Sequence, residues 1–402
     1  MDSISALLLS PLALVAILVG PCWLRHNLIF RCFAVFVTVV LSWNTVCFTR
    51  QVNMVIDYVT GILSAWYIIW ATSIMFCQGS IACRRHCQCS RFTDKVSKSL
   101  KEPTMNCSDI PARFSWDRLF WTLDLVTNFR LVGMDWHDGP RPKQNVGERN
   151  QSAGKLTFAI KHVLKLIGGY LWINLSYEML FKEANDAFSK QNLVSRCRIL
   201  QYLGCLSVLG TSMTMLHSSL ALLWLIHQPL GLSENGLTFP PLWGPRSSIL
   251  RSGLQGFWGE FWQDLFRIGL LSCGKAVLPA KYRNQPAAYI FPVFLLSGIM
   301  HTAGTLAVTG CTWAIGRTMA FFVLQPFGII VQKLIIAALQ QLSIIKYPRG
   351  TGKSVVQLMY MAVWARLTLP LLLDDLLLAG IMNDFLAPWS VFGCIYRTIY
   401  PN

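Results

Sequence analysis

A histidine stands inside an apolar stretch of the chain that is long enough to cross a membrane. His301 lies in the run FLLSGIMHTAG, residues 294–304, with Ser297 one helical turn before it and Thr305 one turn after it. Ionisable side chains at membrane depth are rare and usually mark a function, such as proton transfer by a neutral imidazole. The alternative is a neutral histidine that hydrogen-bonds across helices and only strengthens their packing.

A second segment with polar residues at regular spacing, LQGFWGEFWQDLFR, covers residues 254–267. On a single helix its polar side chains recur at i, i+3, i+4 and i+7, and they form one stripe of Glu260, Gln263, Asp264 and Arg267. Aromatic and leucine side chains cover the remaining surface, which disfavours contact with water. We therefore expect an amphipathic helix at the membrane interface. It is either a simple anchor or a helix whose stripe faces a reaction chamber.

The elements that must position these residues are membrane spans. The chain has 402 residues, of which 53% are hydrophobic and 13% are charged, about half the charged share of soluble domains. Apolar runs of about 20 residues are long enough to span a bilayer, and at that length a helix is the expected structure. We predict an all-α fold, a polytopic transmembrane bundle with interfacial amphipathic helices. About eight spans are expected, near residues 5–24, 28–48, 54–78, 156–180, 199–226, 287–311, 315–340 and 356–382.

The predicted spans divide the chain into three parts. These are N-terminal spans over 1–78, a polar loop over 79–155, and a core over 156–402 that carries the interfacial helix 254–267 and the catalytic helix 287–311. The net charge of +16 fits the tendency of cytoplasmic loops to collect Lys and Arg, so loops 79–155 and 227–286 are expected on the cytoplasmic side of the endoplasmic reticulum. Nucleic acid is not an expected partner, because no basic domain stands apart from the spans.

Cysteines and a histidine cluster directly after the third predicted span. They are Cys77, Cys83, His86, Cys87 and Cys89. Their spacing fits no regular zinc pattern, so no metal ligands are assigned among them. Ordinary juxtamembrane cysteines, palmitoylated cysteines and a metal site are the three alternatives that the spacing leaves open.

Three short motifs resemble those of the membrane-bound O-acyltransferase superfamily, most closely its wax-synthase-like branch. The first resembles N-x-R-x-x-G-x-x-W and is carried by Asn128, Arg130, Gly133 and Trp136. The second resembles F-W-G-x-x-W-H and is carried by Phe257, Trp258, Gly259 and Trp262, with Gln263 in place of the final histidine. The third resembles F-x-x-S-G-x-x-H and is carried by Phe294, Ser297, Gly298 and His301. The resemblance extends from about residue 128 to the end of the chain.

The resemblance implies an enzyme. Within that branch, fungal proteins that acetylate terpenoid or meroterpenoid alcohols are the most similar. A membrane enzyme of secondary metabolism is therefore expected, which transfers acetyl from acetyl-CoA to the hydroxyl of a lipophilic alcohol and needs no metal. The alternatives are a long-chain wax-ester synthase and a proton-coupled transporter, although the chain lacks the paired Gly/Pro breaks expected in the two halves of a transporter.

The resemblance also implies roles for individual residues. His301 is expected to take the proton from the acceptor hydroxyl, and Gln263 to orient the donor or bond the developing oxyanion. The family usually has His or Asn where this chain has Gln263. Because glutamine can hydrogen-bond but is not a strong base, proton transfer is left to His301. The residues expected to bind the acyl-CoA are Trp258, Trp262, Asp264, Arg267 and Ser297.

Overall fold

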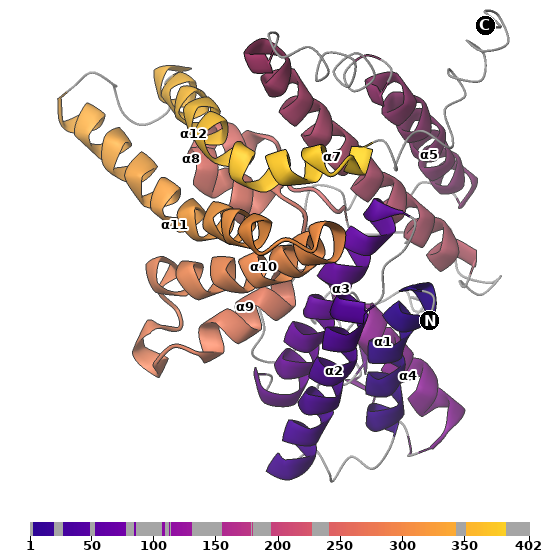
Figure 1. The fold of residues 1–402 in the computed structure, drawn as a ribbon. Helices are drawn as coiled ribbons and strands as arrows, with labels where there is room; N and C mark the ends of the chain where they lie inside the picture. The colour runs from indigo at the N-terminus through magenta and orange to yellow at the C-terminus, as the bar shows by residue number, and fades with distance from the viewer. Residues whose placement is uncertain are drawn as a thin grey trace, which may run out of the picture. The chain divides into compact units, whose positions relative to one another are not determined.

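The computed structural model describes residues 3–19, 27–48, 53–77, 84–85, 107–108, 112, 114–130, 155–177, 179, 194–226, 241–342 and 351–382. Within these ranges the fold is helical, and the predicted all-α class is confirmed (Figure 1). A short antiparallel ladder between β1 (Arg84–Arg85) and β2 (Cys107–Ser108) is the one exception among the described residues. The α-helices are α1 (Ser3–Val19), α2 (Leu28–Phe48), α3 (Met54–Thr72), α4 (Trp116–Thr127), α5 (Lys155–Tyr177), α7 (Val194–Ile226), α8 (Ser247–Gly256), α9 (Arg267–Ala276), α10 (Pro286–Thr309), α11 (Thr312–Gln341) and α12 (Thr351–Leu378).

Seven of the described helices are long and apolar enough to cross a membrane. They are α2, α3 together with the π-helical turn η2 (Ser73–Cys77), α5, α7, α10, α11 and α12. Each coincides with a predicted span. The remaining predicted span, 5–24, corresponds to α1, which has 17 residues. Residues 20–24 of this predicted span lie outside the described residues.

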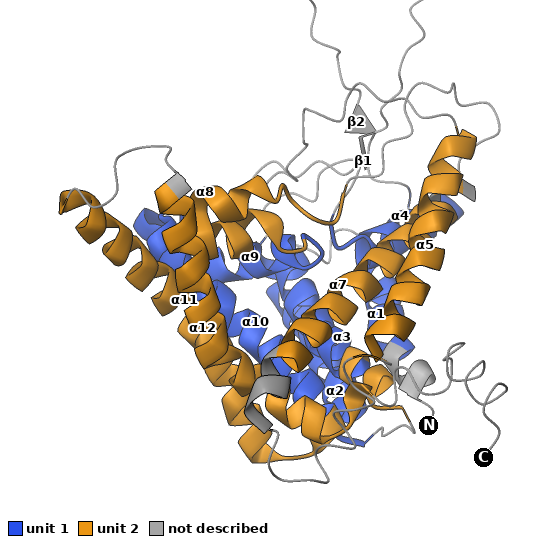
Figure 2. Cartoon of the chain, turned by 90° about the horizontal axis from the view of Figure 1, so that it is seen from above, with its two compact units in different colours: residues 1–49, 60–143, 264–307 blue, residues 50–59, 144–263, 308–402 orange. Residues whose placement is uncertain are grey.

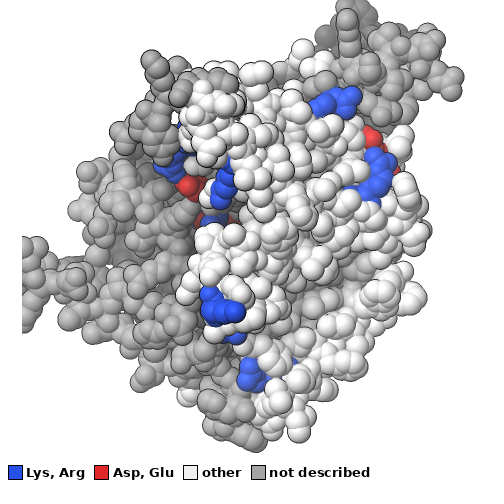
Figure 3. Space-filling view, turned by 90° about the vertical axis from the view of Figure 1, so that its left-hand side faces the viewer, with Lys and Arg blue, Asp and Glu red and all other residues white. Residues whose placement is uncertain are grey.

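The spans expose apolar side chains along whole faces. On α5 the exposed residues include Leu156, Ile160, Leu164 and Ile167, which recur every three or four positions and so share one face. Figure 3 shows a side of the molecule on which most described side chains are neither acidic nor basic. Continuous apolar faces of this kind fit contact with lipid rather than with water.

Two compact units, interleaved along the chain, make up the fold (Figure 2). The first comprises residues 1–49, 60–143 and 264–307, and the second comprises 50–59, 144–263 and 308–402. Within the first unit α1 packs on α2 and α4, and α9 packs on η2. Within the second unit α5 packs on α7, α11 packs on α12, and α8 packs on both α11 and α12.

The core of the first unit is built around two tryptophans of α3. Trp66 and Trp70 are fully buried and stacked, with ring centroids 5.4 Å apart. Phe129 and Phe266 pack on Trp66 at 5.3 and 4.7 Å, so the same core holds the segment after α4 and the start of α9. The Trp70 indole donates a hydrogen bond of 3.1 Å to the carbonyl of Leu125, which satisfies its buried polar atom.

Several predicted features lie largely or wholly outside the described residues. They are the polar loop 79–155, residues 227–240 of the second loop, Cys83, His86, Cys87 and Cys89 of the cysteine cluster, and Gly133 and Trp136 of the first motif. Cys77 is described, and its sulfur lies 3.8 Å from that of Cys273 on α9, with both thiols free. The division of the chain at residues 78 and 155 stays a prediction.

Candidate functional site

The histidine is carried by α10, whose bounds Pro286–Thr309 agree with the helix predicted over 287–311. The His301 side chain is half-buried, as is that of Ser297 one turn earlier. The Thr305 hydroxyl donates to the backbone carbonyl of His301 at 3.2 Å, so this hydroxyl is turned to its own helix backbone. The polar face predicted around the imidazole therefore depends mainly on Ser297.

The position of His301 depends on a close approach between α3 and α10 in the first unit. A Cβ atom at Gly61 would lie 2.5 Å from the carbonyl oxygen of Ala303 and 2.7 Å from the Cα of Gly304. Both obstacles are backbone atoms, which cannot rotate away. Small residues at such contacts let transmembrane helices pack backbone to backbone. This contact lies directly after His301 in the sequence, so it supports the turn of α10 that carries the imidazole.

Replacing Gly61 with leucine should therefore force α3 away from α10. We expect a loss of stability of about 1–3 kcal/mol, typical of overpacked sites, and a lower rate of any reaction that needs His301. Thermal unfolding in detergent measures the first effect. The matched control is Gly168→Leu on α5, because a Cβ atom at Gly168 meets nothing within 4 Å. Equal unfolding temperatures for the two variants would contradict the proposed role of this helix contact.

The segment 254–267 is not the single amphipathic helix that its sequence predicts. Gly253 has φ +57° and interrupts α8, and the chain then forms a π-helical turn, η5 (Phe257–Phe261). Trp262 has ψ 145°, which ends the helical conformation until α9 begins at Arg267. A π-turn contains more residues than an α-turn, so the i, i+3, i+4, i+7 register is lost. The predicted polar stripe is wrong, and Glu260 instead forms an ion pair with Arg251.

Glutamines from α11 and α12 hold this irregular segment in place. The carboxamide oxygen of Gln332 accepts a 2.8 Å hydrogen bond from the backbone N–H of Leu254, and its nitrogen donates to the carbonyl of Gln357 at 3.4 Å. The Gln357 nitrogen in turn donates to the carbonyl of Arg251 at 3.1 Å. A helix end leaves backbone groups without partners inside the helix, and here buried amides satisfy two of them.

Aromatic rings gather around the π-helical turn in the second unit. Phe257 lies 5.0 Å from Trp258 and 5.4 Å from Trp262 between ring centroids, and Trp243 lies 5.4 Å from Trp262. Both tryptophans that were predicted to bind the acyl donor therefore belong to one cluster. Gln263, which directly follows Trp262, is half-buried at the end of this cluster.

Asp264 and Arg267 lie at the start of α9 in the first unit, half-buried and 3.8 Å apart between carboxylate oxygen and guanidinium nitrogen. A third charge belongs to this group. Arg130, from the first motif, is buried, and its burial lowers the pKa of the guanidinium while the carboxylate of Asp264 opposes that shift. Asp264 therefore balances two arginines. Its predicted contact with acyl-CoA stays a prediction, and in this structure its carboxylate faces arginine side chains that could hold the phosphates of coenzyme A.

The described residues contain no group of three or more His, Cys, Asp and Glu side chains that could hold a metal ion. Two further histidines of the second unit, His162 on α5 and His217 on α7, lie 6.0 Å apart between ring centroids. His162 is buried and packs on Phe158. These two histidines are not part of any predicted motif.

One segment of the chain, which includes His301, matches a known protein family. Residues 239–324 match the model of the membrane bound O-acyl transferase family. Over these residues the chain is similar to the acyltransferases of that family. The matched segment contains the π-helical turn, α9 and all of α10, and with them every residue predicted for the site. The match confirms the resemblance that the motifs indicate, and it favours an acyltransferase over a transporter.

Three fungal acetyltransferases are similar to this chain. Acetyltransferase ple2 of Rhodocybe pseudopiperita is 27% identical over 228 residues, which are 54% of this chain and 55% of the relative. Acetyltransferase atnC of Arthrinium sp. is 23% identical over 273 residues, 63% and 61% of the two chains. Acetyltransferase spyB of Aspergillus fumigatus is 26% identical over 150 residues, 33% and 25% of the two chains. The matched regions thus span a quarter to three fifths of the length of these relatives. No solved structure matches the chain.

Three buried glutamines near the candidate site were not predicted from the sequence. Gln325, Gln332 and Gln357 are all buried inside long apolar helices. Gln325 and Gln332 are seven residues apart on α11, which places them on one face. An uncharged amide inside a span is less conspicuous in a sequence than a charged group. It also needs a hydrogen-bonding partner when it is buried, as a charged group does.

Proposed function

We propose that this protein is an integral membrane enzyme that transfers an acetyl group from acetyl-CoA to the hydroxyl of a lipophilic alcohol, a terpenoid or meroterpenoid. The observation that carries the proposal is the family match over residues 239–324, which includes a histidine within an apolar span. The three similar proteins are all named acetyltransferases, which favours acetyl over a longer acyl chain. The endoplasmic reticulum is the membrane we assign.

In this proposal His301 is the general base. The acceptor oxygen attacks the thioester carbonyl carbon, and the hydroxyl proton passes to the neutral imidazole. The carbon–sulfur bond then breaks, and the imidazolium returns its proton to the coenzyme A thiolate. The products are an acetate ester and free coenzyme A. A positioned base typically contributes about 10²–10⁴ in rate.

Gln263 is assigned to the thioester carbonyl. Its carboxamide N–H donates to the oxygen on which negative charge develops, a contact that stabilises the transition state more than the ground state. Arg267, balanced by Asp264, is assigned to the phosphates of coenzyme A, and Ser297 to a hydrogen bond with the donor. Trp258 and Trp262 are assigned to the apolar wall along the pantetheine chain.

The two substrates explain why the base lies within the membrane. A lipophilic alcohol dissolves in the bilayer, whereas coenzyme A, which carries several phosphates, does not. A base part-way down a span is accessible to a hydroxyl from the bilayer and to the thioester end of a donor from the water. Exclusion of water from such a site also protects the acetyl group from hydrolysis.

The test is a transfer assay with the purified protein in lipid nanodiscs. Acetyl-CoA labelled on the acetyl group is incubated with a panel of terpenoid and meroterpenoid alcohols, and labelled ester is extracted and counted. A parallel series with acyl chains of increasing length distinguishes an acetyltransferase from a wax-ester synthase. Labelled ester from acetyl-CoA is the expected result. The proposal would be overturned if no ester forms from any acyl-CoA with any alcohol of the panel.

Replacing Gln263 with alanine should slow acetyl transfer by about 10²–10³-fold, because one hydrogen bond to the oxyanion is lost. The lower turnover should appear at saturating acetyl-CoA, since the contact acts on the transition state. Gln263→Asn and Gln263→His, which keep a donor, should retain more activity than Gln263→Ala. If the alanine variant turns over at the wild-type rate, Gln263 has no part in the mechanism.

A further inference from the structure

A buried glutamine in the middle of α11 bonds two tryptophans at once. Gln325 is only 1% exposed, in a helix that is otherwise largely apolar. Its carboxamide oxygen accepts from the indole of Trp258 at 3.2 Å and from the indole of Trp364 at 3.1 Å. Its nitrogen donates to the carbonyl of Phe321 at 2.9 Å. An indole N–H can only donate, so the chemistry of the two rings requires the amide oxygen to face them.

The second tryptophan is itself held firmly against α11. A Cβ atom at Gly328 would lie 2.4 Å from the Trp364 ring, so the ring rests directly on the helix backbone. Tyr360 stacks on Trp364 with an angle of 10° between the rings, and its hydroxyl donates to the carbonyl of Gly328 at 2.8 Å. Trp364 therefore fixes the carboxamide of Gln325 from one side, which leaves the other lone pair of the oxygen directed at Trp258.

The hydrogen bond to Gln325 defines the orientation of Trp258 more strictly than its ring contacts do. This tryptophan lies in the π-helical turn η5, and its ring contacts include edge-to-face contacts with Phe257, Trp262 and Phe321, with centroids 5.0 to 6.4 Å apart. Such ring contacts leave several orientations of similar energy, whereas a hydrogen bond in an apolar environment has a defined direction. Loss of the acceptor would remove the hydrogen bond that the indole N–H of this half-buried ring makes to Gln325, and the ring would turn to find another partner.

From these contacts we infer that Gln325 is a positioning residue for Trp258 and sets the orientation of the indole that lines the acyl-donor site. The inference rests on the proposed function, in which Trp258 forms part of the wall along the pantetheine chain. Gln325 lies one residue beyond the segment that matches the family model, and Trp364 lies on the next helix. The wall of the donor site is therefore aligned from α11 and α12, by residues outside the matched segment.

The kinetic test compares three variants in the acetyl-transfer assay. Gln325→Met keeps the volume and removes the acceptor, and it should raise the KM for acetyl-CoA about tenfold with kcat changed less than threefold. Gln325→Glu should restore KM to within about threefold of wild type. A carboxylic acid kept neutral in the apolar span has a carbonyl to accept both indoles and an O–H to donate to Phe321. Gln341→Met, at the exposed end of the same helix, is the matched control and should leave KM unchanged.

A second measurement does not depend on activity. The chain contains 15 tryptophans, so 5-fluorotryptophan labelling gives a fluorine NMR spectrum in which the Trp258 signal is assigned by its absence in Trp258→Phe. Gln325→Met should shift or broaden that signal, and Gln325→Glu should restore it. A purely structural role would lower the amount of folded protein without changing KM.

Two results would overturn the inference: an unchanged Trp258 signal in Gln325→Met, or a wild-type KM for that variant at equal amounts of folded protein. If the wild-type protein forms no ester at all, the proposed function fails, and the fluorine spectrum still decides whether Gln325 orients Trp258.

Discussion

Replacing His301 with alanine should reduce ester formation by about 10²–10⁴, the usual contribution of a positioned general base. The remaining site would still bind both substrates, so the loss should appear in kcat rather than in the KM for acetyl-CoA. The side chain is half-buried on the surface of α10, and its removal leaves the Gly61 contact and the Trp66–Trp70 core in place. We therefore expect the variant to fold, with a gel-filtration profile and unfolding temperature close to those of wild type.

His217→Ala is the matched control for this experiment, because His217 also lies half-buried in a span but belongs to no family motif. Its acetyl transfer should equal that of wild type within about twofold, as expected for a residue that takes no part in proton transfer. Added imidazole should restore part of the rate to His301→Ala by supplying a base from solution. Wild-type turnover by His301→Ala would show that the base is a different residue.

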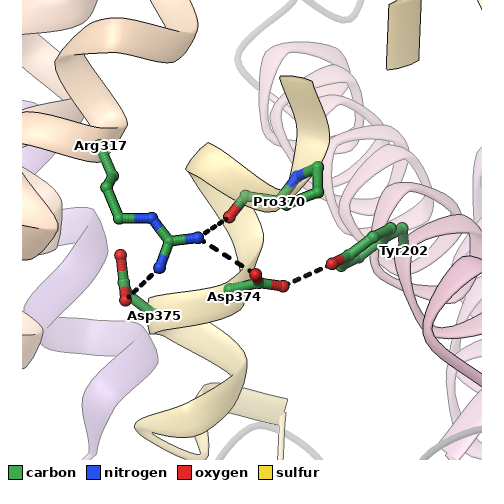
Figure 4. Close-up of polar contacts among 5 residues, drawn as sticks. All are labelled: Tyr202, Arg317, Pro370, Asp374 and Asp375. Carbon is green, nitrogen blue, oxygen red and sulfur yellow. Dashed lines mark hydrogen bonds and ion pairs between the residues drawn. The ribbon is translucent and has the colours of Figure 1, made fainter. Parts of the chain in front are cut away.

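The largest effect on stability should come from Arg317, which connects three spans of the second unit (Figure 4). Its guanidinium contacts the carboxylates of Asp374 and Asp375 at 3.1 Å each and donates to the carbonyl of Pro370 at 2.8 Å. The Tyr202 hydroxyl of α7 donates to Asp374. The arginine and the two carboxylates are only 23%, 17% and 16% exposed, so one cation serves two largely buried anions.

Arg317→Ala should therefore destabilise the protein by about 3–5 kcal/mol, because it leaves two carboxylates in an apolar environment without a counter-charge. The expected observation is a lower unfolding temperature in detergent and a smaller monodisperse fraction. The control is the triple variant Arg317→Gln, Asp374→Asn and Asp375→Asn, which removes every charge and should recover most of the lost stability. An Arg317→Ala variant as stable as wild type would show that these ion pairs contribute nothing to the fold.

The helices themselves could be predicted from the sequence because membrane spans obey a simple length and hydropathy rule. The bounds of α2, α5, α10 and α11 differ from the predicted bounds by three residues or fewer. The choice of His301 as the central residue followed from the same rule, since one ionisable group in an apolar run is conspicuous. Arg317, Asp374 and Asp375 are also charged residues inside spans, and no role was predicted for them, because the ion pairs form only when α11 and α12 pack together.

The local structure around residues 254–267 could not be predicted from periodicity. A helical pattern assumes one register throughout, whereas this segment contains an interrupted helix, a π-helical turn and an extended Trp262. These conformations are stabilised by contacts distant in sequence, such as the bond from the Leu254 N–H to Gln332. Tertiary contacts of this kind override local propensity, and they are typical of functional segments.

The proposed mechanism requires the thioester of the acyl donor to lie beside His301. Electron cryomicroscopy of the protein in nanodiscs, with a non-transferable analogue of acetyl-CoA bound, would show the path of the pantetheine chain. We predict that its acyl carbonyl carbon ends within about 5 Å of the His301 imidazole, close enough for a hydroxyl to lie between them at near-attack distances. A pantetheine chain that ends elsewhere, with His301 packed only against lipid or sealed between helices, would contradict the account.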